Sequence, residues 1–318
     1  MHRAGEAVPE KPGAGSTPVF DSWRIVVQNI ANVSDQMLKL ARFHEPCYGR
    51  RMAPRGGCGR TERVDAWWAA PAITAIGLLV FFGYLTFRAF NPTYVWYEPY
   101  ISPTVAPPLF TPASGYPGAV PIERAWFGAF PDWWPAFLPQ SPAFFLPALA
   151  IAFRLTCYYY RGAYYKAFAL TPPACAVRGL PLRYRGETAL LLVQNLHRYT
   201  LYAALVLLVC LWWEAGAAFV RDGRIGVGVG TIVMLVNAGL LTLYAFGCHS
   251  WRHLIGGRLD CFSCERASPP PRYRLWMGVS WLNERHMAFA WVSLVWVAFT
   301  DLYIFLVSRA WIRDLSTW

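Results

Sequence analysis

Five long apolar runs constrain this chain more than any other feature. Each is close to the roughly 20 residues that a helix needs to cross the hydrocarbon layer of a bilayer. The runs extend approximately over residues 67–90, 144–160, 199–219, 225–248 and 287–307. They are continuous rather than alternating, which favours helices over the strands of a membrane barrel. The expected fold class is therefore all-α, an integral membrane bundle of five helices.

The distribution of charge orients this bundle. Only 15% of the residues are charged, against about 25% in soluble domains. Arg and Lys concentrate before the first run, between the second and third, and between the fourth and fifth, and such a bias marks the cytoplasmic side. We therefore expect a cytoplasmic N-terminus and an outer C-terminus. The formal net charge of +11 then reflects topology rather than nucleic-acid binding.

The segments outside the runs have distinct characters. Residues 1–20 are rich in Gly and Pro and predict a disordered tail. Residues 21–43 place apolar side chains at three- and four-residue steps, which predicts an amphipathic helix on the cytoplasmic membrane face. Those side chains are Trp23, Val26, Ile30, Val33, Met37 and Leu40. Residues 44–65 form a basic cytoplasmic linker, residues 66–310 the transmembrane domain, and residues 311–318 an outer tail.

The outer half of the membrane region is expected to be structural. The loop between the first two runs, about residues 91–142, is rich in Pro and aromatic residues, which favour the headgroup layer. It predicts a lid without chemistry of its own. Arg88, Glu214 and Asp301 fall within the runs, and we expect them to pair inside the bundle because unpaired charges there are costly. Arg154, near Cys157, is a further charge at membrane depth.

Imidazoles and thiols gather at the cytoplasmic ends of the runs. The imidazoles are His197, His249, His253 and His286, and the thiols are Cys157, Cys175 and Cys248. The simpler interpretation is solvated interfacial histidines and small buried cysteines. Polar groups at this depth are expensive, however, and a whole layer of them indicates function. Thiols and imidazoles together ligate zinc, or a two-iron centre in which two His replace two Cys on one iron.

A tyrosine-rich segment extends the second run. Its members are Tyr158, Tyr159, Tyr160, Tyr164 and Tyr165. They fit an aromatic interface belt, or an amphipathic rim whose hydroxyl groups hydrogen-bond a quinone head.

Several motifs together resemble one family. They are Cys157 to Arg161 with Tyr164 and Tyr165, Pro172 to Cys175, Gly186 to Thr188, Gln194 to Tyr199, Cys248 to Ser250 with Arg252 and His253, and Asn283 with Arg285 and His286. Over roughly residues 66 to 308 the chain resembles the five-helix membrane anchor of the actinobacterial type of succinate dehydrogenase. The first 60 or so residues extend beyond this pattern. Trp251 stands where a further Cys is expected, so that position is no ligand here.

The resemblance implies a multi-pass subunit of respiratory complex II in the bacterial plasma membrane. Such an anchor carries a Rieske-type [2Fe–2S] cluster and a quinone site, with menaquinone as the expected quinone. A flavoprotein subunit oxidises succinate, and an iron–sulfur subunit passes the electrons on from the cytoplasmic face. The chain would then be the quinone-reducing membrane subunit of this enzyme.

The implied ligands are two thiolates and two imidazoles, and more than four candidates exist. We favour Cys157 and Cys175 as thiolates, with Cys248 in reserve. For the imidazoles we favour His249 together with His197 or His253. The residues expected at the quinone are His286, Arg252, Tyr199 and Tyr160.

Three rival functions fit parts of the sequence. A haem b anchor needs two facing histidines, which His197 with His249 or His286 would supply, but it leaves Cys157 and Cys175 without a role. A membrane transporter for metal ions would need polar residues along the whole path, and the outer half offers few. A purely structural anchor would leave the Cys and His layer unexplained.

Overall fold

The computed structural model describes residues 57–318, apart from residues 114, 181–187, 258, 261 and 263–269. All described residues belong to one compact unit. The predicted tail and amphipathic helix, and most of the predicted linker, lie outside the described residues.

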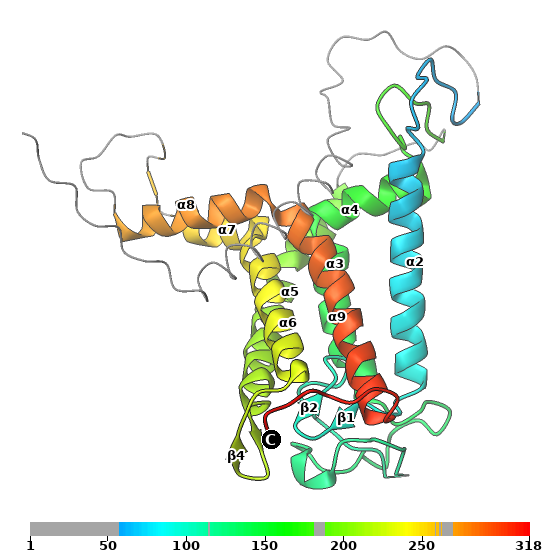
Figure 1. Cartoon of the computed structure of the whole chain (residues 1–318). Helices are drawn as coiled ribbons and strands as arrows, with labels where there is room; N and C mark the ends of the chain where they lie inside the picture. Colours follow the sequence, from blue (N-terminus) through cyan, green and yellow to red (C-terminus); the bar gives the residue numbers. More distant parts are fainter. Residues whose placement is uncertain (1–56, 114, 181–187, 258, 261, 263–269) are drawn as a thin grey trace, which may run out of the picture. The chain divides into compact units, whose positions relative to one another are not determined.

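Within the described residues, four helices are long and apolar enough to cross a membrane. They are α2 (Ala69–Phe90), α5 (Thr188–Ala217), α6 (Val229–Phe246) and α9 (His286–Ser308). These helices run roughly parallel to one another (Figure 1), with α6 contacting α5 and α9, and α9 contacting α2. The expectation of a mainly helical, membrane-integral fold is confirmed at this level.

The second predicted run is broken, so the prediction of one continuous helix is wrong there. A first part, η2 (Pro142–Phe144) with α3 (Leu146–Thr156), meets a second part, α4 (Tyr158–Tyr164) with η3 (Tyr165–Ala169), at an angle of 80°. The described residues contain a fifth membrane span only if these two parts together are regarded as one bent span. The Thr156 hydroxyl donates back to the carbonyl oxygen of Ala152 at 2.7 Å, a bond that bends helices.

Two further helices lie across the direction of the spans. They are α7 (His249–Gly256) and α8 (Pro271–Glu284), which contact each other at one end of the bundle (Figure 1). We call this the α7/α8 end. Both are less apolar than a span, and hydropathy alone did not indicate them.

The opposite end of the bundle carries the loop predicted as a lid. Two short hairpins lie there, β1 (Trp96–Tyr97) with β2 (Tyr100–Ile101), and β3 (Val220–Arg221) with β4 (Arg224–Ile225). The loop also contains the 3₁₀ turn η1 (Ile122–Arg124). Its apolar side chains share one buried cluster with residues of α5, α6 and α9. The loop is thus folded onto the helices.

A buried carboxylate connects this loop to two spans. Asp301 of α9 is fully buried and accepts a hydrogen bond from Nε of Arg88 at 2.7 Å. The hydroxyl groups of Tyr84, Ser102 and Thr104 also donate to it. The expectation that the charges at membrane depth pair inside the bundle is confirmed for Arg88 and Asp301. Within the described part of the chain, Glu214 has no ion-pair partner.

A second carboxylate holds the C-terminal segment against the spans. Asp314 accepts hydrogen bonds from the hydroxyl groups of Tyr100 and Tyr303, each at 2.5 Å, and from the amide of Gly230 at 3.1 Å. Gly228 lies so close that a Cβ atom there would overlap Tyr100 and Asp314. The glycine therefore permits the contact.

Replacing Gly228 by Ala is expected to lower the free energy of unfolding by about 1–3 kcal/mol, the usual cost of overpacking. Thermal unfolding in detergent measures the effect. Gly239→Ala is the matched control, because a Cβ at this second glycine of α6 meets nothing within 4 Å. Equal loss of stability in both variants would contradict the account.

Candidate metal-cluster site

Two cysteine–histidine pairs lie buried toward the α7/α8 end. The Sγ atom of Cys157 is 3.4 Å from Nε2 of His286, and Sγ of Cys248 is 3.1 Å from Nε2 of His197. Their exposed fractions are 3% for Cys157, 0% for Cys248, 5% for His197 and 8% for His286. We call these four residues the Cys/His set. Sulfur and imidazole donors shielded from water suit zinc or an iron–sulfur centre.

The local fold explains why these residues meet. Cys157 immediately precedes α4 and Cys248 immediately precedes α7, and both have extended backbone conformations. Each cysteine therefore occupies a break where the chain leaves a span and turns into a transverse helix. His286 is the first residue of α9, and His197 lies near the same end of α5. Interruptions of regular helix thus bring distant parts of the sequence together.

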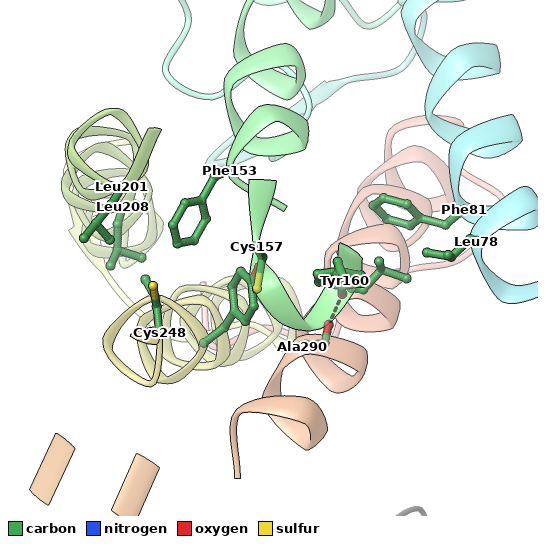
Figure 2. Packing of buried hydrophobic residues seen from close by; sticks show 12 residues of the cluster. Leu78, Phe81, Phe153, Cys157, Tyr160, Leu201, Leu208, Cys248 and Ala290 are labelled. Atoms are coloured by element: carbon green, nitrogen blue, oxygen red, sulfur yellow. Dashed lines mark hydrogen bonds between the residues drawn. The ribbon is translucent and has the colours of Figure 1, made fainter. Parts of the chain in front are cut away.

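Two aromatic rings join the pairs into one site. Phe153 stacks on the His197 ring with centroids 4.6 Å apart and planes inclined by 6°. Tyr244 stacks on the His286 ring at 5.0 Å and 10°. Phe153 and Tyr244 contact each other edge to face at 5.5 Å. Figure 2 shows Phe153, Cys157 and Cys248 in one buried cluster. The two pairs therefore share an aromatic frame.

The outer nitrogens of the two imidazoles differ in their partners. Nδ1 of His197 lies 2.9 Å from the Thr156 hydroxyl, and such a bond fixes the orientation of a ligand ring. Among the described residues, Nδ1 of His286 and the hydroxyl of Tyr244 are buried without a hydrogen-bond partner. A buried polar atom left unpaired costs about 1–3 kcal/mol. The Tyr244 hydroxyl is therefore available to a bound group.

Three of the predicted metal ligands are not part of the buried Cys/His set, although His249 directly follows Cys248. His249 and His253 are exposed on α7, with ring centroids 6.5 Å apart. Partial burial of His249, together with His253 and Arg252, lowers the pKa of its imidazole. Cys175 is disulfide-bonded, with its partner outside the described residues, so it offers no thiolate. In the described ranges, no three His, Cys, Asp or Glu side chains converge to hold a single metal ion.

The predicted quinone residues do not form one group. His286 lies against Cys157 instead. Tyr160 is buried, donating to the carbonyl oxygen of Ala290 at 2.7 Å. Tyr199 is 71% exposed, because it follows His197 by about 200° around the helix. Arg252 donates to the Ser280 hydroxyl at 2.9 Å and lies over Trp276 of α8.

An apolar cavity lies next to the Cys/His set. Helices α2, α3, α5, α6 and α9 contribute to its wall, and Phe153 and Tyr244 are part of it. Arg154 is its one charged lining residue. Residues Pro103, Thr104 and Ala106 of the outer loop also line it. Arg154 was recognisable in the sequence as a charge at membrane depth, whereas nothing in the sequence distinguished Tyr244 from the other tyrosines.

Comparison with known proteins identifies the family. The profile of actinobacterial succinate dehydrogenase subunit SdhC matches residues 69–310, a range that contains the whole Cys/His set. The chain is similar to a chain of the Mycobacterium smegmatis Sdh1 complex in the apo form, with 40% sequence identity and a TM-score of 0.69. That match covers 81% of this chain and 94% of the other. No match was found among curated proteins. The chain therefore belongs to the family of actinobacterial succinate dehydrogenase subunit SdhC, as a membrane anchor of that enzyme.

Proposed function

We propose that the Cys/His set holds a Rieske-type [2Fe–2S] cluster and that the chain delivers electrons to a quinone. The observation that carries the proposal is the meeting of two thiols and two imidazoles, with sulfur–nitrogen distances of 3.4 and 3.1 Å. A cluster of this type takes two Cys on one iron and two His on the other. The Cys/His set has this composition.

The surroundings of the Cys/His set fit such a group. The four side chains are buried, so their donor atoms are shielded from water. In such a centre one iron would take the two thiolates and the other the two imidazoles, so Cys157 would share an iron with Cys248, and His197 with His286, in place of the two Cys–His contacts of this structure. Haem b would need two imidazoles facing each other, whereas each buried ring here faces a thiol.

When bound, such a cluster takes up and releases one electron at a time. The protein supplies its surroundings: Phe153 and Tyr244 hold the two imidazole rings and exclude water, and Thr156 orients His197. These three contacts keep the donors fixed while the charge changes.

The quinone is proposed to occupy the apolar cavity. Quinone-sized ligands bind in apolar pockets that contain a few convergent polar groups. Here those groups are the guanidinium of Arg154 and the hydroxyl of Tyr244, which has no other partner among the described residues. Tyr160 acts indirectly, because its hydroxyl accepts a hydrogen bond from Arg154 at 2.8 Å. Menaquinone remains the expected species.

The electrons are proposed to arrive from a flavoprotein and an iron–sulfur subunit docked at the α7/α8 end. The concentration of Arg in the segments at this end marks it as cytoplasmic, with the N-terminus on the same side. The similar M. smegmatis chain belongs to a complex, which supports association with partner subunits.

Electron paramagnetic resonance at low temperature on the succinate-reduced complex tests the proposed cluster. A rhombic signal with a low average g value is expected. Its absence, or a haem absorption spectrum in its place, would contradict the proposal.

Replacing Tyr244 by Phe is expected to separate activity from stability. The variant removes a hydroxyl that is buried without a partner, so the melting temperature should stay equal or rise. Quinone reduction should fall about 10-fold, which corresponds to one lost hydrogen bond to the quinone head. Activity assays and thermal unfolding of the intact complex measure both. Tyr202→Phe is the control, because Tyr202 of α5 is 52% exposed. Unchanged quinone reduction by the Tyr244 variant would place the quinone elsewhere.

A further inference from the structure

Arg154 is a charged side chain buried in the bundle, and the described residues provide no counter-ion for it. Its exposed fraction is 6%. Nη1 donates to the Tyr160 hydroxyl at 2.8 Å and to the Ala290 carbonyl oxygen at 3.1 Å, and Nη2 donates to the Ser293 hydroxyl at 3.0 Å. All three acceptors are neutral. Among the described residues, no carboxylate forms an ion pair with it.

Such an arrangement is costly. The effective penalty for removing an ion from water is several kcal/mol even after relaxation, and neutral acceptors offset only part of it. Arg88 in the same bundle shows the usual solution, since it pairs with the buried Asp301. The contrast indicates that the positive charge of Arg154 serves something other than stability.

The position of Arg154 indicates what its charge acts on. It precedes Cys157 by three residues, so the two lie close along the chain at the end of α3. Its guanidinium carbon is 4.5 Å from the centre of the Tyr244 ring, and that ring stacks on His286. The Tyr244 ring thus contacts both the guanidinium and the His286 imidazole, and the charge lies in a region where water screens it weakly.

We propose that Arg154 is a fixed positive charge that raises the reduction potential of the redox centre held by the Cys/His set. The inference rests on the proposed function. One-electron reduction by the iron–sulfur subunit adds one negative charge to the centre, and no bond is formed or broken. Arg154 stays protonated throughout and favours the reduced state by Coulomb attraction. Arg154 also lines the cavity, where the quinone is proposed to bind. Its charge therefore stabilises negative charge on the reduced centre before electron transfer and on the quinone after it.

The test is a redox titration of the intact complex, followed by electron paramagnetic resonance of the centre. Arg154→Gln removes the charge but keeps hydrogen-bonding groups. At a fixed potential we expect the ratio of oxidised to reduced centre to rise at least tenfold, which is a fall of 59 mV for one electron. Arg154→Lys keeps the charge and should restore most of the native potential.

Two changes at Ser293 separate charge from structure. Ser293→Ala removes one hydrogen bond of Arg154 but no charge, and the potential should stay native. Ser293→Asp places a carboxylate beside Nη2 and neutralises the guanidinium while Arg154 remains, so the potential should fall as with Gln. The Ser293→Asp variant therefore tests the effect of the charge even if the Arg154→Gln chain does not assemble into the complex.

The outcomes distinguish the two proposals. A native potential in both Arg154→Gln and Ser293→Asp, with the signal intact, would overturn the role of Arg154 alone. An equal fall in Ser293→Ala would also overturn it, because the effect would then be structural. Loss of quinone binding at unchanged potential would make Arg154 only a ligand for the quinone head. Absence of the signal in the native complex would overturn the proposed function itself.

Discussion

Replacing Cys157 or Cys248 by Ala is expected to abolish the cluster signal and to lower quinone reduction at least ~100-fold. Loss of an outer partner of a metal ligand costs 10–100-fold, and loss of the ligand itself costs no less. Oxidation of succinate with an artificial electron acceptor should continue, because that reaction belongs to the proposed flavoprotein subunit. The comparison of the two activities in the intact complex is the measurement.

The chain provides matched controls for both kinds of ligand. Cys210 is a half-buried free cysteine of α5 that lies outside the Cys/His set, and Cys210→Ala should leave the signal and both activities unchanged. His249→Ala is the control for the histidines, because the His249 side chain is exposed on α7. If His249→Ala removed the signal and His286→Ala did not, the ligand assignment would be wrong.

Replacing Asp301 by Ala is expected to lower the free energy of unfolding by about 3–5 kcal/mol. The change leaves the Arg88 guanidinium, which is 2% exposed, as an uncompensated buried charge. It also frees the hydroxyl groups of Ser102 and Thr104, which hold the outer loop where it lines the cavity. Thermal unfolding of the chain in detergent measures the loss.

Two further variants control for the role of charge at Asp301. The double variant Arg88→Met with Asp301→Leu removes both charges and should recover most of the stability, since an apolar pair can replace a buried ion pair. Glu98→Gln breaks the ion pair of Glu98, which is 49% exposed, with Arg124, which is 45% exposed. This variant should change the free energy of unfolding by less than about 1 kcal/mol. If Asp301→Ala were as stable as Glu98→Gln, Asp301 would not be needed to compensate the buried charge of Arg88.

Features that depend on residue type and order were predictable from the sequence. Hydropathy located the four uninterrupted spans, because each is a long run of apolar residues. The cost of unpaired charge in a membrane predicted that Arg88, Glu214 and Asp301 would pair inside the bundle, and Arg88 and Asp301 do so. The concentration of Cys and His near one end of the runs was visible as well. Each of these depends on local composition.

Features that depend on packing were not predictable in this way. At the break Cys157 has an extended backbone conformation between α3 and α4, which a hydropathy average cannot register. The contact of His286 with Cys157 depends on how α9 meets the broken helix. The exposure of Tyr199, in contrast, could have been inferred from its angle of about 200° to His197 around one helix.

Two imidazoles of this chain, those of His197 and His286, are proposed to ligate an iron centre. Pulsed electron paramagnetic resonance on the reduced complex, with histidine labelled by ¹⁵N, counts the directly bound imidazoles. For the native complex we expect couplings to two histidine nitrogens. If the His197→Ala or the His286→Ala variant retains the centre, it should show only one of these two couplings. A signal without any histidine coupling would contradict the claim.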